Sequence, residues 1–117
     1  MFKVIIAGSR DFDDYNLLRN TMDKLLVNKT QVTIISGTAR GADRLGEQYA
    51  QERGYNLLRF PADWDKYGKK AGYIRNKEMA RAADACVVFW NGQSKGSKHM
   101  IDIAKKHGLQ LRIIRYR

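Results

Sequence analysis

The feature of this sequence that most restricts its fold is a regular alternation between short apolar runs and segments with helical spacing. Five runs are rich in Val, Ile, Leu and Phe, and four segments between them place apolar residues three and four positions apart. Such runs are typical of strands buried on both faces, and such segments are typical of amphipathic helices. The expected strands are Lys3–Arg10, Val32–Gly37, Asn56–Ala62, Ala85–Gly92 and Leu109–Tyr116, and the expected helices are Asp13–Val27, Gly41–Gly54, Ala71–Asp84 and Ser97–Gly108.

This alternation predicts a parallel sheet covered by helices on both faces. We therefore expect a Rossmann-like, three-layer α/β fold with a five-stranded parallel sheet in the order 3-2-1-4-5, counting strands along the chain. Its 117 residues suit one domain, residues 1–117. The polar segment Asp63–Lys70 is expected to be a loop, and the last strand, with its alternating arginines, should lie at the sheet edge.

The composition excludes several other classes of protein. Cys86 is the only cysteine, so neither a disulfide framework nor a cysteine-based zinc site can form. His99 and His107 are eight residues apart without carboxylates at ligand spacing, so no metal and no cofactor is predicted. Without an apolar stretch of about 18 residues or a signal-peptide pattern, we expect a cytoplasmic protein with no membrane partner.

The positive charge of the chain is concentrated in its second half. The formal net charge is +10, and residues 59–117 hold fourteen Lys or Arg against five Asp or Glu, whereas residues 1–58 hold eight against seven. This asymmetry favours an anionic partner, either nucleic acid or a phosphate-bearing ligand. A solvated surface that keeps the chain in solution is the alternative interpretation.

The expected fold also predicts where a ligand would bind. In open parallel sheets, ligands bind beyond the carboxyl ends of the strands where the strand order reverses, here between the first and fourth strands. Four of the five strand ends carry glycine or polar clusters. The candidate ligand-binding residues are Gly8, Ser9, Arg10, Ser36, Gly37, Arg40, Gly41, Asp43, Trp64, Arg75, Asn76, Trp90, Gly92, Ser94, Gly96 and Ser97.

The first two clusters combine glycines with groups that suit an anion. In Gly8–Arg10, glycine permits close backbone approach and Arg10 can donate two hydrogen bonds to a phosphate, although an ordinary turn has the same composition. Ser36–Asp43 (SGTARGAD) would present backbone N–H groups at a helix N-terminus. It matches neither the dinucleotide fingerprint nor the P-loop. Asp43 would either cap N–H groups or accept a hydrogen bond from a ribose hydroxyl.

The other two clusters add aromatic and arginine side chains. Trp64 could stack on a base or cover the core, and Arg75 could bind phosphate at the start of a helix. The Trp90–Ser97 loop, rich in glycine and serine, resembles a phosphate cradle, with Ser97 placed to cap the following helix. Three glycine-containing loops at one edge of the sheet carry more weight than any one of them.

Four segments together resemble a known family. GSRDF, SGTARGAD, FPADWDKYGKKAGYIRN and FWNGQSKGS are similar to the SLOG superfamily of Rossmann-like domains, and most similar to its small YspA-type (YpsA-related, YAcAr-like) branch, common in bacteria and phages. The resemblance implies a pocket for a nucleotide or a nucleotide-derived small molecule. SGTARGAD also resembles a segment of the Smf/DprA proteins, which bind single-stranded DNA and carry an Arg-Asn pair where this chain has Arg75-Asn76.

A further resemblance, to the lysine-decarboxylase-like (LOG) phosphoribohydrolases, raises the question of catalysis. Arg75 matches the arginine of that family and Gly96-Ser97 matches a Gly-Thr pair, but Met100 stands at the position of its glutamate. Methionine cannot orient a ribose or stabilise an oxocarbenium charge, so the sequence favours binding over hydrolysis. Three hypotheses follow: a domain that binds or senses a phosphorylated nucleotide derivative, a nucleotide N-glycosidase that uses Arg75, and a single-stranded DNA-binding protein. A homo-oligomer is compatible with each of them.

Overall fold

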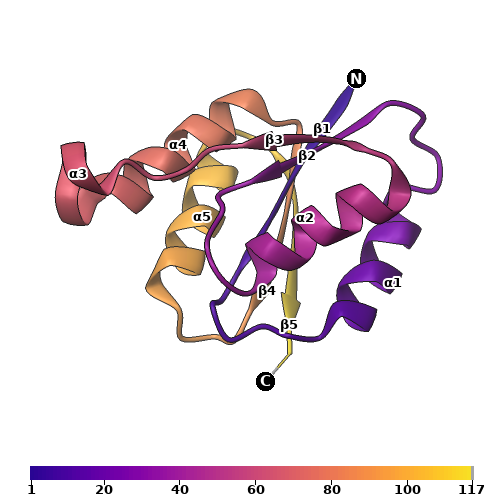
Figure 1. Ribbon diagram of the computed structural model, residues 1–117, viewed down its shortest axis with the longest axis horizontal. Coiled ribbons are helices and arrows are strands. Elements are labelled where there is room, and N and C mark those ends of the chain that lie inside the picture. The colour runs from indigo at the N-terminus through magenta and orange to yellow at the C-terminus, as the bar shows by residue number, and fades with distance from the viewer. Residues whose placement is uncertain (117) are drawn as a thin grey trace.

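A computed structural model describes residues 1–116 and contains the expected five-stranded parallel sheet (Figure 1). Its strands follow the order β3-β2-β1-β4-β5, which confirms the predicted order and places β5 at an edge. All four strand pairings are parallel. The strands are β1 (Phe2–Gly8), β2 (Val32–Ser36), β3 (Asn56–Arg59), β4 (Ala85–Trp90) and β5 (Gln110–Arg115).

Helices cover both faces of this sheet, as the alternation predicts. On one face, α1 (Tyr15–Leu25) and α2 (Ala42–Arg53) bury apolar side chains against the strands. On the other face, α4 (Ala71–Ala82) and α5 (Lys95–Lys106) form a second cluster of buried side chains. The three layers confirm the predicted α/β class.

The central strand β1 contributes to both apolar clusters because its side chains alternate between the two faces of the sheet. Val4 and Ile6 belong to the cluster under α1 and α2, whereas Ile5 and Ala7 belong to the cluster under α4 and α5. None of these four side chains is more than 7% exposed. Burial on both faces explains why the run reads as continuously apolar rather than alternating.

The prediction of a loop at Asp63–Lys70 is wrong. The segment folds into a short helix, α3 (Trp64–Tyr67), followed by a 3₁₀ turn, η1 (Gly68–Lys70). The Asp63 carboxylate caps α3 by accepting the Lys66 N–H at 3.1 Å, a local signal for a helix start. No residue of α3 or η1 is buried, and α3 lies at the outer margin of the molecule in Figure 1.

Two element boundaries differ from the predicted ones for identifiable reasons. Strand β3 ends at Arg59, before the predicted end at Ala62, because Phe60 still donates its N–H to Ser36 at 2.8 Å but Pro61 has no N–H. The last of the long helices begins at Lys95, and Ser94 is its cap, accepting the Ser97 N–H at 3.3 Å. The predicted capping role of Ser97 is therefore wrong.

No helix within residues 1–116 combines the length and the apolar character that crossing a membrane requires.

Candidate functional site

A pocket of about 250 Å³ opens beyond the carboxyl end of β1 and is bordered by the start of α2, the α3–α4 segment and the start of α5. We call it the inner pocket. It lies where the strand order reverses, between β1 and β4, as expected for an open parallel sheet. Nine of the candidate residues line it: Gly8, Arg10, Asp43, Trp64, Arg75, Asn76, Ser94, Gly96 and Ser97.

A second hollow, of about 370 Å³, adjoins the inner pocket, and we call it the outer hollow. Gly37, Thr38 and Arg40 line it together with Pro61 and Ala62. The two spaces share four residues: Arg10, Ala39, Trp64 and Arg75.

Two of the candidate glycines are required by close approach of the backbone. A Cβ on Gly8 would lie 2.2 Å from the carbonyl oxygen of Phe89 and 2.8 Å from the Cβ of Ala42. Gly41 has φ +77°, and a Cβ there would lie 2.3 Å from the carbonyl oxygen of Ser9. These glycines let the end of β1, the end of β4 and the start of α2 meet at the edge of the sheet.

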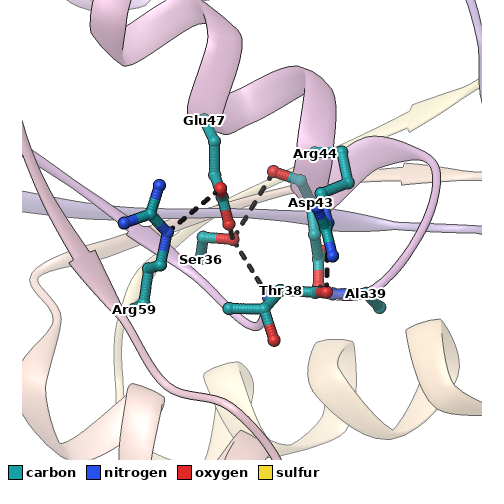
Figure 2. Close-up of polar contacts among 7 residues, drawn as sticks. All are labelled: Ser36, Thr38, Ala39, Asp43, Arg44, Glu47 and Arg59. Atoms are coloured by element: carbon teal, nitrogen blue, oxygen red, sulfur yellow. Dashed lines mark hydrogen bonds and ion pairs between the residues drawn. The ribbon is translucent and has the colours of Figure 1, made fainter.

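The loop after β2 is held by a network of polar contacts between β2, α2 and β3 (Figure 2). The buried Ser36 hydroxyl donates to Glu47 at 2.7 Å and accepts the Thr38 N–H at 3.0 Å. Glu47 also accepts the Arg59 Nε–H at 3.1 Å. Thr38 adopts φ +66°, a conformation that β-branched residues rarely take. Ser36 therefore positions the loop and does not itself line either space.

Asp43 is buried beneath this loop at the inner pocket. Its Oδ2 accepts the Ala39 N–H at 3.0 Å, a bond to the loop that precedes α2 rather than to the N–H groups of the helix. Burial raises the pKa of Asp43 to about 6, and the hydrogen bond from Ala39 and the charge of Arg75 act in the opposite direction. A carboxylate in this environment holds a proton more readily than one in water.

Arg75 is fixed by the backbone on one side and by an amide on the other. Its Nη1 donates to the Gly37 carbonyl oxygen, and its Nε donates to Oδ1 of Asn76 at 3.0 Å. The Asn76 amide in turn contacts Nδ1 of His99 at 3.1 Å. Burial lowers the pKa of Arg75, while the neighbouring Asp43 raises it. Because a guanidinium titrates far above neutral pH, Arg75 remains a cation directed at the site.

Like Ser36 and Gly41, the candidate residues Ser9, Trp90 and Gly92 line neither space, and these three organise the loop after β4. Ser9 is buried, and its hydroxyl accepts the Asn91 N–H at 3.1 Å. The Trp90 indole donates to the Ser94 carbonyl oxygen at 3.1 Å, and the Arg115 guanidinium covers its ring at 5.4 Å. Gly92 has φ +85° and packs against that same arginine.

Lys69 and Tyr73 also line the inner pocket, although they are not among the candidate binding residues. They come from η1 and the first turn of α4, next to the segment that was expected to be a loop. The capping aspartate Asp63 is the sequence signal that a helix starts in this segment.

The arrangement offers several cations and one buried acid around a single space. Arg10, Lys69 and Arg75 line the inner pocket, and among residues 1–116 Asp43 is its only acidic lining residue. Within residues 1–116, no three His, Cys, Asp or Glu side chains come together as metal ligands. The chemistry that these residues can perform is therefore recognition of anions by arginine and acceptance of hydroxyl hydrogen bonds by a carboxylate.

Comparison with known proteins identifies the family. The model of the YspA, cpYpsA-related SLOG family matches residues 2–67. This chain belongs to that family. The gene 61 protein of Mycobacterium phage D29 is 37% identical over 116 residues, and the match covers 93% of both chains.

Solved structures share the fold at low sequence identity. DNA processing protein A (DprA) from Streptococcus pneumoniae has a TM-score of 0.79 at 18% identity; the match covers 100% of this chain and 51% of that one. DNA processing protein A from Helicobacter pylori, described for its single-stranded DNA binding mode, has a TM-score of 0.70 at 20% identity; the match covers 99% of this chain and 66% of that one. The chain therefore spans about half to two thirds of these proteins.

Proposed function

We propose that the inner pocket binds a phosphorylated nucleotide or a nucleotide-derived small molecule. The observation that carries the proposal is the placement of Arg10 and Arg75, beside the buried carboxylate of Asp43, in one pocket at the switch point of the sheet. The arginines suit a phosphate because a guanidinium can donate two parallel hydrogen bonds to its oxygens. Asp43 suits ribose hydroxyls, and the exposed ring of Trp64 suits a base.

Binding without hydrolysis is the form of this function that the site supports. Met100 lines the inner pocket at the position where the phosphoribohydrolases carry a glutamate, and its thioether cannot act as an acid or a base. Asp43 is the one carboxylate among the lining residues in the described part of the chain, and it already accepts the Ala39 N–H. A nucleotide N-glycosidase is therefore the less favoured alternative, and free base released from nucleoside monophosphates would support it.

The test is binding of the four common nucleoside 5′-monophosphates to purified, nucleotide-free protein, by thermal shift and calorimetry. We expect at least one to bind and Arg75→Gln to weaken its binding at least tenfold, the loss of about one charge-assisted contact. Arg81→Gln removes the same charge from the last turn of α4, outside both spaces, and should leave binding unchanged. If none of the nucleotides shifts the melting temperature or gives heat, the proposal is wrong.

A single-stranded nucleic acid is the second candidate ligand. Trp64 is 53% exposed and Tyr67 is 40% exposed, and Lys66 and Lys69 lie in the same segment. Exposed rings among cations suit stacked bases and their phosphates, and the similar fold of the DNA processing proteins adds to this candidate. It requires oligonucleotide binding at low salt that far exceeds mononucleotide binding. Oligonucleotide binding that is absent even at low salt excludes it.

A further inference from the structure

We propose that the outer hollow receives a second nucleotide unit, joined through phosphate to the unit in the inner pocket. This inference rests on the proposed function and specifies the ligand as longer than a mononucleotide. It follows from the way that the two spaces join, from the charges around the outer one, and from the hydrogen bonds that hold one of its walls.

The two spaces are parts of one surface because they share walls. Arg10, Trp64 and Arg75 border both of them. The inner pocket, at about 250 Å³, is smaller than the roughly 300–1,000 Å³ typical of ligand sites. A ligand that fills both spaces would pass Arg75, which borders both. The phosphate that links its two units would then lie beside the Arg75 guanidinium.

The charge around the outer hollow is suited to a phosphate. Arg10, Arg40 and Arg75 line it, and no carboxylate of residues 1–116 does so. Arg40 is exposed and makes no hydrogen bond or ion pair with another residue in the described part of the chain. Because the Arg40 guanidinium donates no hydrogen bond within the described part of the chain, its five N–H donors are available for a ligand.

One wall of the outer hollow, the loop after β2, is held in place by hydrogen bonds within the protein. The Thr38 N–H is bound by the Ser36 hydroxyl, and the Thr38 carbonyl oxygen accepts the Arg44 Nε–H at 3.3 Å. The neighbouring Ala39 N–H is bound by Asp43. A preorganised loop binds without the entropic cost of ordering it, so the strained conformation of Thr38 is consistent with a role in binding.

The experiment compares three probes on the wild-type protein and on two variants. The probes are a nucleoside 5′-monophosphate that the protein binds, the 5′-phosphorylated DNA dinucleotide with the same base, and the pyrophosphate-linked dinucleotide with that base. The variants are Arg40→Gln and the charge-matched control Arg81→Gln, whose side chain is exposed in the last turn of α4. Calorimetry at one fixed salt concentration gives all the affinities.

We expect one linked dinucleotide to bind at least tenfold more tightly than the monophosphate. Arg40→Gln should remove about tenfold of dinucleotide affinity and change monophosphate affinity less than twofold, and Arg81→Gln should change neither. Tighter binding of the DNA dinucleotide would indicate that the ligand is the end of a nucleic acid. Tighter binding of the pyrophosphate-linked dinucleotide would indicate a small molecule.

Two results would overturn the inference and leave the proposed function standing. One is that the monophosphate binds as tightly as both dinucleotides. The other is that Arg40→Gln lowers the affinities for the monophosphate and for the dinucleotides by the same factor. Failure of the monophosphates to bind the wild-type protein would instead contradict the proposed function itself.

Discussion

At the level of single residues, Asp43 lines the inner pocket, and burying its carboxylate there costs folding free energy. Its side chain is buried, and burial raises its pKa to about 6 from an ordinary value of 3.8. Folding therefore disfavours the ionised form of this carboxylate. A surface aspartate would not carry that cost, so its burial at the inner pocket is consistent with a role in ligand recognition.

The pH dependence of stability should reveal this cost. A folded-state pKa above the unfolded value means that the folded chain holds the proton more tightly. The contribution of Asp43 is therefore most favourable below about pH 4 and is lost as pH rises through about 6. Asp43→Asn keeps an acceptor for the Ala39 N–H but cannot ionise. We expect its free energy of unfolding, relative to the wild type, to rise by about 2 kcal/mol between pH 4 and pH 8.

Urea unfolding of both proteins across that pH range measures the difference directly. Taking the difference between the two proteins cancels the titration of the groups that they share. A difference that stays constant with pH would mean that Asp43 titrates normally in the folded chain.

At the level of elements, α2 is bounded by two glycines, and glycine is required at each position for a different structural reason. Gly41 and Gly54 both have positive φ, at +77° and +70°. A Cβ at Gly41 would clash with the Ser9 carbonyl oxygen, whereas a Cβ at Gly54 would have no neighbour within 4 Å. The first glycine joins α2 to the end of β1, and the second only ends the helix.

Alanine at each end of α2 should separate these two effects. Gly54→Ala should cost about 1 kcal/mol of unfolding free energy, the price of a left-handed alanine. Gly41→Ala should cost at least about 3 kcal/mol, because the clash adds to the same conformational cost. Denaturant unfolding of both variants provides the comparison, and equal costs would show that the loop before α2 moves aside easily.

Glu47 of α2 also holds β2 and β3 in place. Glu47→Ala would leave the buried Ser36 hydroxyl with only its long contact to the Asp43 carbonyl oxygen, at 3.5 Å, and we expect a loss of about 1–2 kcal/mol in unfolding free energy. Glu47→Gln keeps an acceptor and should lose less than half as much, because the side chain of Arg59 is 54% exposed and its ion pair contributes little. The exposed Glu78 of α4 provides a control, Glu78→Ala. Urea unfolding in which the two alanine variants match would contradict the role of Glu47.

The sequence predicted the elements well and the side-chain geometry only in part. Periodicity predicted every strand and long helix, because burial on one or both faces determines that pattern locally. It could not distinguish Arg40 in the outer hollow from Arg75 shared by both spaces, because that depends on tertiary packing. Trp90 is a candidate for packing on a base, but it lines neither space, and its indole donates to the Ser94 carbonyl oxygen. The sequence predicts which loops lie at one edge of the sheet. It does not predict which of their side chains point into the pocket and which point away from it.

At the level of the whole molecule, the net charge of +10 comes from more cations than those that line the two spaces. Arg10, Arg40, Lys69 and Arg75 line the two spaces. Other cations, such as those in the last turn of α5, lie at the opposite end of that helix from its pocket-lining residues. The charge therefore has a local part at the binding surface and a distributed part elsewhere.

Salt dependence of oligonucleotide binding should separate the two parts. For a single strand, the logarithm of the binding constant falls with the logarithm of salt concentration by about 0.7 for each phosphate neutralised. If only the four cations of the two spaces contact phosphate, the slope should reach about −3 and stay there as the strand is lengthened beyond a few nucleotides. Fluorescence anisotropy with labelled strands of two to twelve nucleotides, titrated with potassium chloride, measures this slope. A slope that steepens steadily with strand length would mean that the distributed cations follow the strand, because a site of fixed extent cannot release more counterions from a longer ligand.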